Sequence, residues 1–304
     1  MMRKPLGAFL ALLLTLPLPA LSQERVTLGW GRLLTNDAIG DGRDRWRTGS
    51  YVLSRVRGPN WRGALPSTPG EILEFRLRLE TIAPADLVSP LATDRRYVGA
   101  LSFGMHTHFD MSGMETALGA DLVIVGPQTK ISSLHGHLHD VLGLPAPTVF
   151  GAQIGDAFLP TLTGEVGHSF QVTPAVQLRP FAEAQLGAET LVRLGGDLTF
   201  GHFATGALML RDVSTGQRYR AAQGNRTDGI SLTLGGDIAK VFDSRYVVDS
   251  DPNTLSDSRS RLRAGLHWQG GESEAFYGLT WLGEEYDEQP TGQVVGSVNL
   301  RVKF

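Results

Sequence analysis

The sequence predicts an all-β protein, a transmembrane antiparallel β-barrel of about twelve strands with a short helix in an extracellular loop. Period-two alternation of apolar and polar residues recurs along the chain after residue 23. The polar positions repeatedly carry large charges of both signs. The most apolar internal piece, 122–125, is far shorter than the roughly 20 residues that a spanning helix needs. The mature chain is therefore expected to cross a membrane as a barrel or not at all.

The alternation is clearest in 71–81, 176–186, 261–268 and 298–304. In the first of these segments, leucine and phenylalanine alternate with glutamate and arginine. A soluble β-protein, the alternative fold, also alternates, but its polar face meets water. Strands whose polar face carries charges able to pair across neighbouring strands are typical of a polar lumen inside an apolar, lipid-facing wall.

Twelve segments show strand character, and an even number suits a bacterial barrel with both termini in the periplasm. The segments are 25–34, 46–57, 71–82, 97–110, 114–126, 157–172, 175–187, 190–202, 230–247, 259–269, 274–286 and 293–304. The stretch 203–229 has no assignment from its pattern and is expected to be an extra hairpin or a long periplasmic turn. Since the first strand runs outward, the connections after odd strands are extracellular. These connections are 35–45, 83–96, 127–156, 188–189, 248–258 and 287–292.

The N-terminus reads as an export signal. Arg3 and Lys4 precede an apolar run over 6–18, and small residues at 20 and 22 suit signal-peptidase cleavage. We therefore expect a signal peptide over 1–22, with a retained N-terminal anchor as the alternative.

The mature barrel is then expected to cover 23–304 and to reside in the bacterial outer membrane. The final Phe304 follows an alternating strand and resembles the C-terminal signal read by the barrel assembly machinery. The chain has no cysteine, which excludes a disulfide or thiolate site. The net charge of −3, without a basic block, argues against a nucleic-acid partner.

The first outer loop, 35–45, concentrates oxygen ligands. Asn36 and Asp37 close the first strand, and Asp41 and Asp44 follow in the same loop. Carboxylate and amide oxygens suit a hard cation such as Ca²⁺. A solvated acidic turn is the alternative interpretation.

The third outer loop, 127–156, contains the predicted helix. Its leucines and valine have helical spacing, and Gly143 is a helix stop. His135 and His139 then lie one turn apart on one face. Such a pair can bind a transition metal if a third ligand is found. The alternatives are a single neutral histidine acting as a general base and a plain surface helix.

A second group of histidines lies on the fourth strand. His106, His108 and Asp110 alternate there and share a face with Ser102. They are expected to fill a polar lumen, with a metal site near the periplasmic end as the alternative. No nucleophile elbow, P-loop or HExxH helix occurs in the sequence.

Four stretches in order along the chain resemble the lipid A 3′-O-deacylase family, which are calcium-dependent outer-membrane barrels of twelve strands. The stretches are Asn36-Asp37 with Asp44-Arg45-Trp46-Arg47-Thr48-Gly49; Asp94-Arg95-Arg96-Tyr97-Val98-Gly99; Gly126-Pro127 with His139 and Gly143; and Phe150-Gly151-Ala152-Gln153. The resemblance implies hydrolysis of the ester that holds the 3′-acyloxyacyl chain of lipid A, the lipid of lipopolysaccharide.

The resemblance also implies roles for individual residues. His139 would activate water, while Asn36 and Asp37 would organise Ca²⁺ against the ester carbonyl, with Asp37 as a metal ligand. Arg95 and Arg96 would bind a glucosamine phosphate. Thr48, with Ser50 as a second candidate, would take the place of a family serine beside the substrate.

The chain departs from the family pattern at several positions. An acidic residue usually follows the catalytic histidine, but 144–147 reads Leu-Pro-Ala-Pro. Arg47 replaces a tyrosine, Arg96 replaces a proline, and His135 stands where glutamine is usual. A non-catalytic barrel, either a small pore or a structural protein, is therefore the alternative function.

Overall fold

The structure is a computed structural model that describes residues 24–224, 227–248 and 251–302. The predicted signal peptide over 1–22 and the terminal Phe304 lie outside the described residues. Within the described ranges, no helix is long and apolar enough to cross a membrane.

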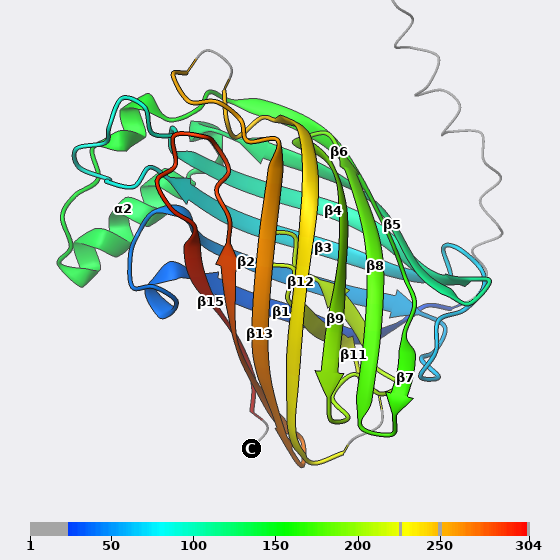
Figure 1. The fold of residues 1–304 in the computed structure, drawn as a ribbon. Coiled ribbons are helices and arrows are strands. Elements are labelled where there is room, and N and C mark those ends of the chain that lie inside the picture. Colours follow the sequence, from blue (N-terminus) through cyan, green and yellow to red (C-terminus); the bar gives the residue numbers. More distant parts are fainter. Residues whose placement is uncertain (1–23, 225–226, 249–250, 303–304) are drawn as a thin grey trace, which may run out of the picture.

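The strands form one closed antiparallel barrel (Figure 1). Within the described ranges it has twelve long strands: β1 (Val26–Asn36), β2 (Trp46–Gly58), β3 (Ile72–Ala83), β4 (Val98–Met111), β5 (Met114–Val125), β6 (Ala157–Gly167), β8 (Val176–Leu186), β9 (Glu189–Phe200), β12 (Gly229–Ser244), β13 (Ser258–Gly270), β14 (Ser273–Leu282) and β15 (Gln293–Arg301). Consecutive long strands pair, β1 pairs with β15, and so the ring closes. The predicted fold class is confirmed.

The strand boundaries agree with the predicted segments to within a few residues, with one interruption. The segment 157–172 divides into β6 and the short β7 (Phe170–Thr173). The chain leaves the ladder at His168, whose Nδ1 lies 2.6 Å from the carbonyl oxygen of Gly113 in the neighbouring turn.

The two faces of the wall separate as the alternation predicts. Phe75 and Phe103 are 43% and 51% exposed on the outside, whereas Glu74 and Glu80 are buried inside. The charged side chains that face the lumen form ion pairs with one another. For example, Asp237 binds Arg193, Arg261 and Arg263, and Asp197 binds Arg211 and Arg263. The apolar side chains of each strand face outward, toward the lipid.

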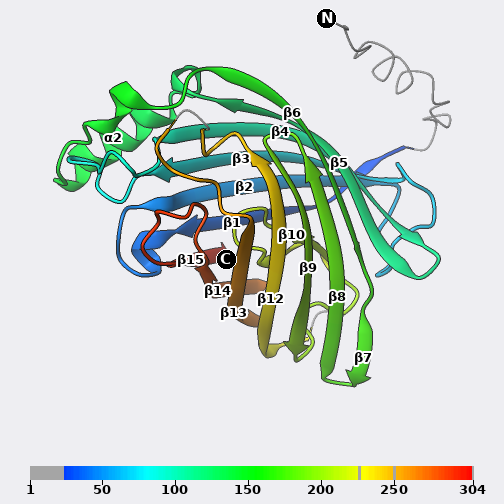
Figure 2. The ribbon, with the colours of Figure 1, turned by 45° about the horizontal axis from the view of Figure 1, so that its top comes forward.

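The stretch 203–229 contains the extra hairpin that was one of its two expected forms. Its strands, β10 (Leu208–Arg211) and β11 (Arg218–Ala222), pair with each other and lie within the ring of long strands (Figure 2). Tyr219 and Leu210 pack with Leu33 of β1 in a buried apolar cluster. Gly29 permits this contact, because a Cβ there would lie 2.0 Å from the carbonyl oxygen of Ala221.

The connections that the sequence predicts to be extracellular gather at one end of the barrel. This is the outer end if both termini are periplasmic (Figure 1). They contain α2 (Ile131–Leu142) and the short helices η1 (Asp37–Ile39), η2 (Pro127–Thr129) and η3 (Val149–Ala152). The predicted helix is confirmed. It ends at Gly143, which has a left-handed φ of 68° that glycine adopts without strain.

Candidate active site

The outer ends of β1 and β2 position the first group of candidate residues. Asn36 is the last paired residue of β1 and lies opposite Gly49. Its Oδ1 accepts a hydrogen bond of 2.8 Å from the backbone N–H of Ala38, so it caps the turn of η1. Asp37 and Thr48 are the next residues along the two strands beyond this pair. Asn36 therefore shapes the turn that presents Asp37.

Asp37 is buried in a group of carboxylates. Its Oδ2 accepts a hydrogen bond of 2.8 Å from the backbone N–H of Arg45. Burial, together with the nearby charges of Asp44 and Asp41, raises the pKa of Asp37 to about 8. A cation bound among these oxygens would offset their repulsion. Within the part of the chain that the structure describes, Oδ1 of Asp44 and the hydroxyl of Thr48 are buried without a hydrogen-bond partner.

Helix α2 supplies the second group. His135 and His139 are buried on its inward face, whereas His137 is exposed. Nε2 of His139 lies 2.8 Å from Oδ2 of Asp44, and Nε2 of His135 lies 3.2 Å from the same oxygen. Burial opposes ionisation of Asp44, but its hydrogen bonds with the two histidines hold the pKa of Asp44 below its ordinary value.

The second ring nitrogen of each histidine, Nδ1, also has a polar partner. Nδ1 of His139 donates to the carbonyl oxygen of Pro145 over 2.8 Å. Nδ1 of His135 lies 3.3 Å from the hydroxyl of Tyr97. The rings of Tyr97 and Phe150 meet edge to face with centroids 4.9 Å apart, and together they line the histidine side of the helix. Both imidazoles are thus oriented with Nε2 toward Asp44.

The structure therefore joins two predicted groups that sequence spacing treats separately. Among the described residues, Asp44, His135 and His139 are the one set of histidine, cysteine, aspartate or glutamate side chains with metal-ligand spacing, and their ligand atoms lie within 4.8 Å of one another. Sequence reasoning named the histidine pair but missed Asp44 as its partner. The only available signal was the place of Asp44 at the start of the Asp-Arg motif.

The two arginines proposed for phosphate binding lie in different surroundings. The side chain of Arg95 is buried, pairs with Glu285 and donates to the carbonyl oxygen of Tyr246. The side chain of Arg96 is 45% exposed and pairs with Asp251. Arg96 is therefore accessible from outside, whereas Arg95 ties its loop to the barrel.

Arg47, which replaces the family tyrosine, has a structural explanation. Its guanidinium contacts Glu285 at 2.6 Å, Glu80 at 2.8 Å and Glu189 at 3.3 Å. Since Glu285 also binds Arg95, the two arginines share one carboxylate beneath the outer loops. The substitution adds a positive charge at a place where three carboxylates meet.

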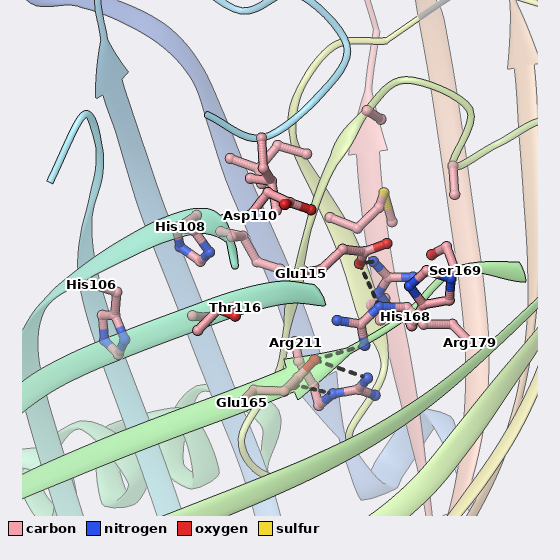
Figure 3. A pocket seen from close by; sticks show the side chains of 18 of the residues that line it. His106, His108, Asp110, Glu115, Thr116, Glu165, His168, Ser169, Arg179 and Arg211 are labelled. Atoms are coloured by element: carbon pink, nitrogen blue, oxygen red, sulfur yellow. Dashed lines mark hydrogen bonds and ion pairs between the residues drawn. The ribbon is translucent and has the colours of Figure 1, made fainter. Parts of the chain in front are cut away.

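The histidines of β4 lie elsewhere, inside the lumen. His108 is 2.9 Å from Glu74, and His106 is 3.2 Å from Asp121. Both line a polar cavity of about 380 Å³ toward the periplasmic end, where Arg179 and Arg211 converge on Glu165 (Figure 3). Each histidine faces its own carboxylate, which agrees with the expected lumen filling. This cavity contains none of the outer-loop residues.

Known proteins share the architecture of this barrel. The family model of the outer membrane protein LpxR matches residues 8–304. The structure of LpxR from Salmonella typhimurium superposes with a TM-score of 0.75 at 14% identity, covering 91% of this chain and 100% of that chain. That likeness shows the fold. No curated protein matches the sequence.

Two other solved barrels are less similar. The beta domain of the Bordetella autotransporter Brka has a TM-score of 0.42 at 12% identity, covering 91% of this chain and 99% of that domain. The CymD monoaromatic hydrocarbon channel has a TM-score of 0.37 at 12% identity, covering 91% and 87%. Scores this low carry no argument about function. Because the family model covers nearly the whole chain, this protein belongs to the LpxR family of outer-membrane proteins, the lipid A 3′-O-deacylase family that its loop motifs resemble.

Proposed function

We propose that this protein hydrolyses the ester that links the 3′-acyloxyacyl chain to lipid A in the outer leaflet of the outer membrane. The observation that carries the proposal is the buried pair of His139 and Asp44 at the outer end, between α2 and the barrel wall. Family membership gives the substrate class. The outer end is also where the lipid A of a bacterial outer membrane is reached.

His139 is the proposed general base. Because the carbonyl oxygen of Pro145 can only accept, Nδ1 of His139 keeps its hydrogen, so the ring becomes a base when Nε2 releases the hydrogen that it shares with Asp44. Nε2 takes a proton from the attacking water, and the resulting imidazolium donates to Oδ2 of Asp44, which stabilises it. The proton then passes to the departing sugar oxygen as the ester C–O bond breaks, giving a free fatty acid and a 3′-hydroxyl.

The oxygens around Asp37 fit the proposed Ca²⁺. Asp37, the unpaired Oδ1 of Asp44 and the unpaired hydroxyl of Thr48 would hold it, since Ca²⁺ prefers oxygen ligands. When bound, Ca²⁺ would polarise the ester carbonyl and stabilise the oxyanion. Asn36 keeps the turn that positions Asp37. The stretch 144–147 has no acid, so this set is one carboxylate short of the family pattern.

The surface of α2 suits a lipid substrate. Leu134, Leu138, Val141 and Leu142 are 49–68% exposed on the face that points away from the histidines. Acyl chains of a membrane lipid would cover this apolar face favourably. Arg96 is the proposed contact for a glucosamine phosphate. Arg95 would join it only by giving up its pairing with Glu285.

Mass spectrometry of lipid A from cells that express the protein tests this function. We expect a lipid A species that has lost its 3′-acyloxyacyl chain, and unchanged lipid A in properly assembled protein would contradict the proposal. The alternative, a small pore, is opposed by the hairpin β10–β11 and by the ion pair of Arg47 and Glu189, which joins the distant strands β2 and β9 across the lumen. Planar-bilayer conductance separates the two, because a large stable conductance without a lipid product would favour the pore. We also propose that the barrel assembly machinery inserts the chain.

A further inference from the structure

We propose that Asp44, His135 and His139 form a binding site for a transition-metal ion of the zinc class, and that this ion inhibits the enzyme. The inhibitory part rests on the proposed function, because it assigns His139 as the base. The binding part stands on the geometry alone.

The first support is the convergence of the two rings on one oxygen. Nε2 of His139 and Nε2 of His135 lie 2.8 Å and 3.2 Å from Oδ2 of Asp44. A general base needs one histidine, and the second ring has no part in that chemistry. Two imidazole nitrogens and one carboxylate with an open position are a common ligand set for divalent transition metals.

The second support is the set of contacts behind the ligands. Histidines that bind metals usually donate the other ring N–H to an oxygen, which fixes the tautomer and the ring orientation. His139 donates to the carbonyl oxygen of Pro145, and Tyr97 places its hydroxyl 3.3 Å from Nδ1 of His135. Both Nε2 atoms then face Oδ2 of Asp44, and a cation could replace the hydrogens that the two rings share with this carboxylate.

The third support is the rigidity and seclusion of the site. His135 and His139 are one turn apart on α2, so the helix backbone sets their spacing. Phe150 packs against Gly136 and the ring of Tyr97, and both histidine side chains are at most 10% exposed. The proposed function assigns the other oxygen of Asp44 to Ca²⁺, so Oδ2 is the oxygen that the transition metal would take.

The ligand types distinguish this ion from Ca²⁺. Imidazole nitrogen suits zinc, copper, nickel and cobalt, whereas Ca²⁺ takes oxygen ligands. His135 supplies the second nitrogen of this ligand set. An ion bonded to Nε2 of His139 occupies the lone pair that would accept the proton from water. Binding of the transition metal and proton transfer by His139 therefore exclude each other.

The test uses the purified full barrel in detergent, freed of metals, and two variants of the same helix. His135→Gln removes one ligand but keeps a polar side chain of similar shape, and His137→Ala is the matched control on the exposed face. Titration with Zn²⁺ by calorimetry, and with Co²⁺ by visible absorption, reports binding without reference to activity. We expect one ion per chain, at least about 10-fold weaker binding in His135→Gln, and wild-type binding in His137→Ala.

The same preparations are then assayed with lipopolysaccharide and excess Ca²⁺. Within each variant, activity with and without Zn²⁺ is compared, and His135→Gln should need at least about 10-fold more Zn²⁺ for half inhibition. Absence of Zn²⁺ binding, or equal loss of binding in His137→Ala, overturns the metal site. Activation by Zn²⁺ overturns the inhibitory role. Binding by a folded protein that is inactive with Ca²⁺ alone overturns the proposed function and the inhibitory role, but supports the metal site.

Discussion

Two regions of this barrel bring histidines close to carboxylates, and they differ in how the charges are shared. In the lumen, His106 faces Asp121 and His108 faces Glu74. Glu74 is further satisfied by Arg76 at 2.6 Å. At the outer end, His135 and His139 converge on a single oxygen of Asp44, and the other oxygen has no partner in the described part of the chain.

This difference indicates that the lumen histidines have a structural role, whereas the histidines at the outer end are placed for chemistry. In the lumen each histidine faces its own carboxylate, and the other charges there form networks of ion pairs, so these groups complete the packing of a polar interior. The outer group is under-matched: Asp37 is buried with a raised pKa, and one oxygen of Asp44 and the hydroxyl of Thr48 have no partner among the described residues, while the other oxygen of Asp44 faces two oriented imidazoles. These groups are therefore open to a further ligand.

The largest effect is expected for His139→Ala. Loss of a general base typically lowers the rate by about 10²–10⁴-fold, while the barrel should still assemble because α2 lies outside the wall. The measurement is the loss of the acyloxyacyl chain from lipopolysaccharide at equal amounts of folded protein.

His108→Ala in the lumen is the matching control. Glu74 keeps Arg76 and the hydroxyl of Ser54 at 2.6 Å, so deacylation should remain close to wild type. Near-normal activity in His139→Ala, or a comparable loss in His108→Ala, would break the contrast between the two regions.

A somewhat smaller loss is expected for Asp37→Ala. Removing one group that stabilises an oxyanion typically costs about 10²–10³-fold in rate, and excess Ca²⁺ should restore only part of it. Asp37→Asn is the useful companion, because it can still accept from the backbone N–H of Arg45. Activity that survives complete removal of divalent ions would show that these oxygens serve the loop and not a cation.

Next in size is the effect of Glu285→Gln, which probes how the lumen supports the site. Arg47 and Arg95 both bind Glu285, and their guanidinium groups help to hold the pKa of Glu285 below its ordinary value against the opposing effect of burial. Breaking a buried pair typically costs about 3–5 kcal/mol, because an uncompensated charge remains. We therefore expect Glu285→Gln to unfold at a lower temperature than the wild type when heated samples are compared by their mobility on gels. An unchanged transition would mean that the loops are anchored independently of Arg47 and Arg95.

The sequence predicts the wall well because alternation is local information. Whether Phe75 faces lipid and Glu74 faces the lumen follows from neighbouring positions alone. The hairpin of β10 and β11 was harder to assign, because strands of four and five residues offer few positions for a pattern. Because both faces of the hairpin are buried inside the barrel, its strands also lack the contrast between a lipid-facing and a lumen-facing side.

The site is predicted only in parts. The helix and its histidine pair follow from spacing within 127–156, but the partner Asp44 is 91 residues from His135 in the chain. The structural role of Arg95 depends on Glu285, 190 residues away. Contacts at such separations depend on how the barrel closes, and no local pattern encodes them.

The smallest effect is expected for His137→Ala, which sharpens the comparison within α2 itself. His137 lies between His135 and His139 in sequence but is exposed on another face of the helix. Surface substitutions of this kind usually change free energies by about 0.5 kcal/mol or less, so activity should stay within about 2-fold of wild type. The measurement is the rate of deacylation beside His139→Ala in the same detergent. If His137→Ala fell as far as His139→Ala, the reacting face of the helix would have to include its exposed side, and Asp44 could not be the partner of the base.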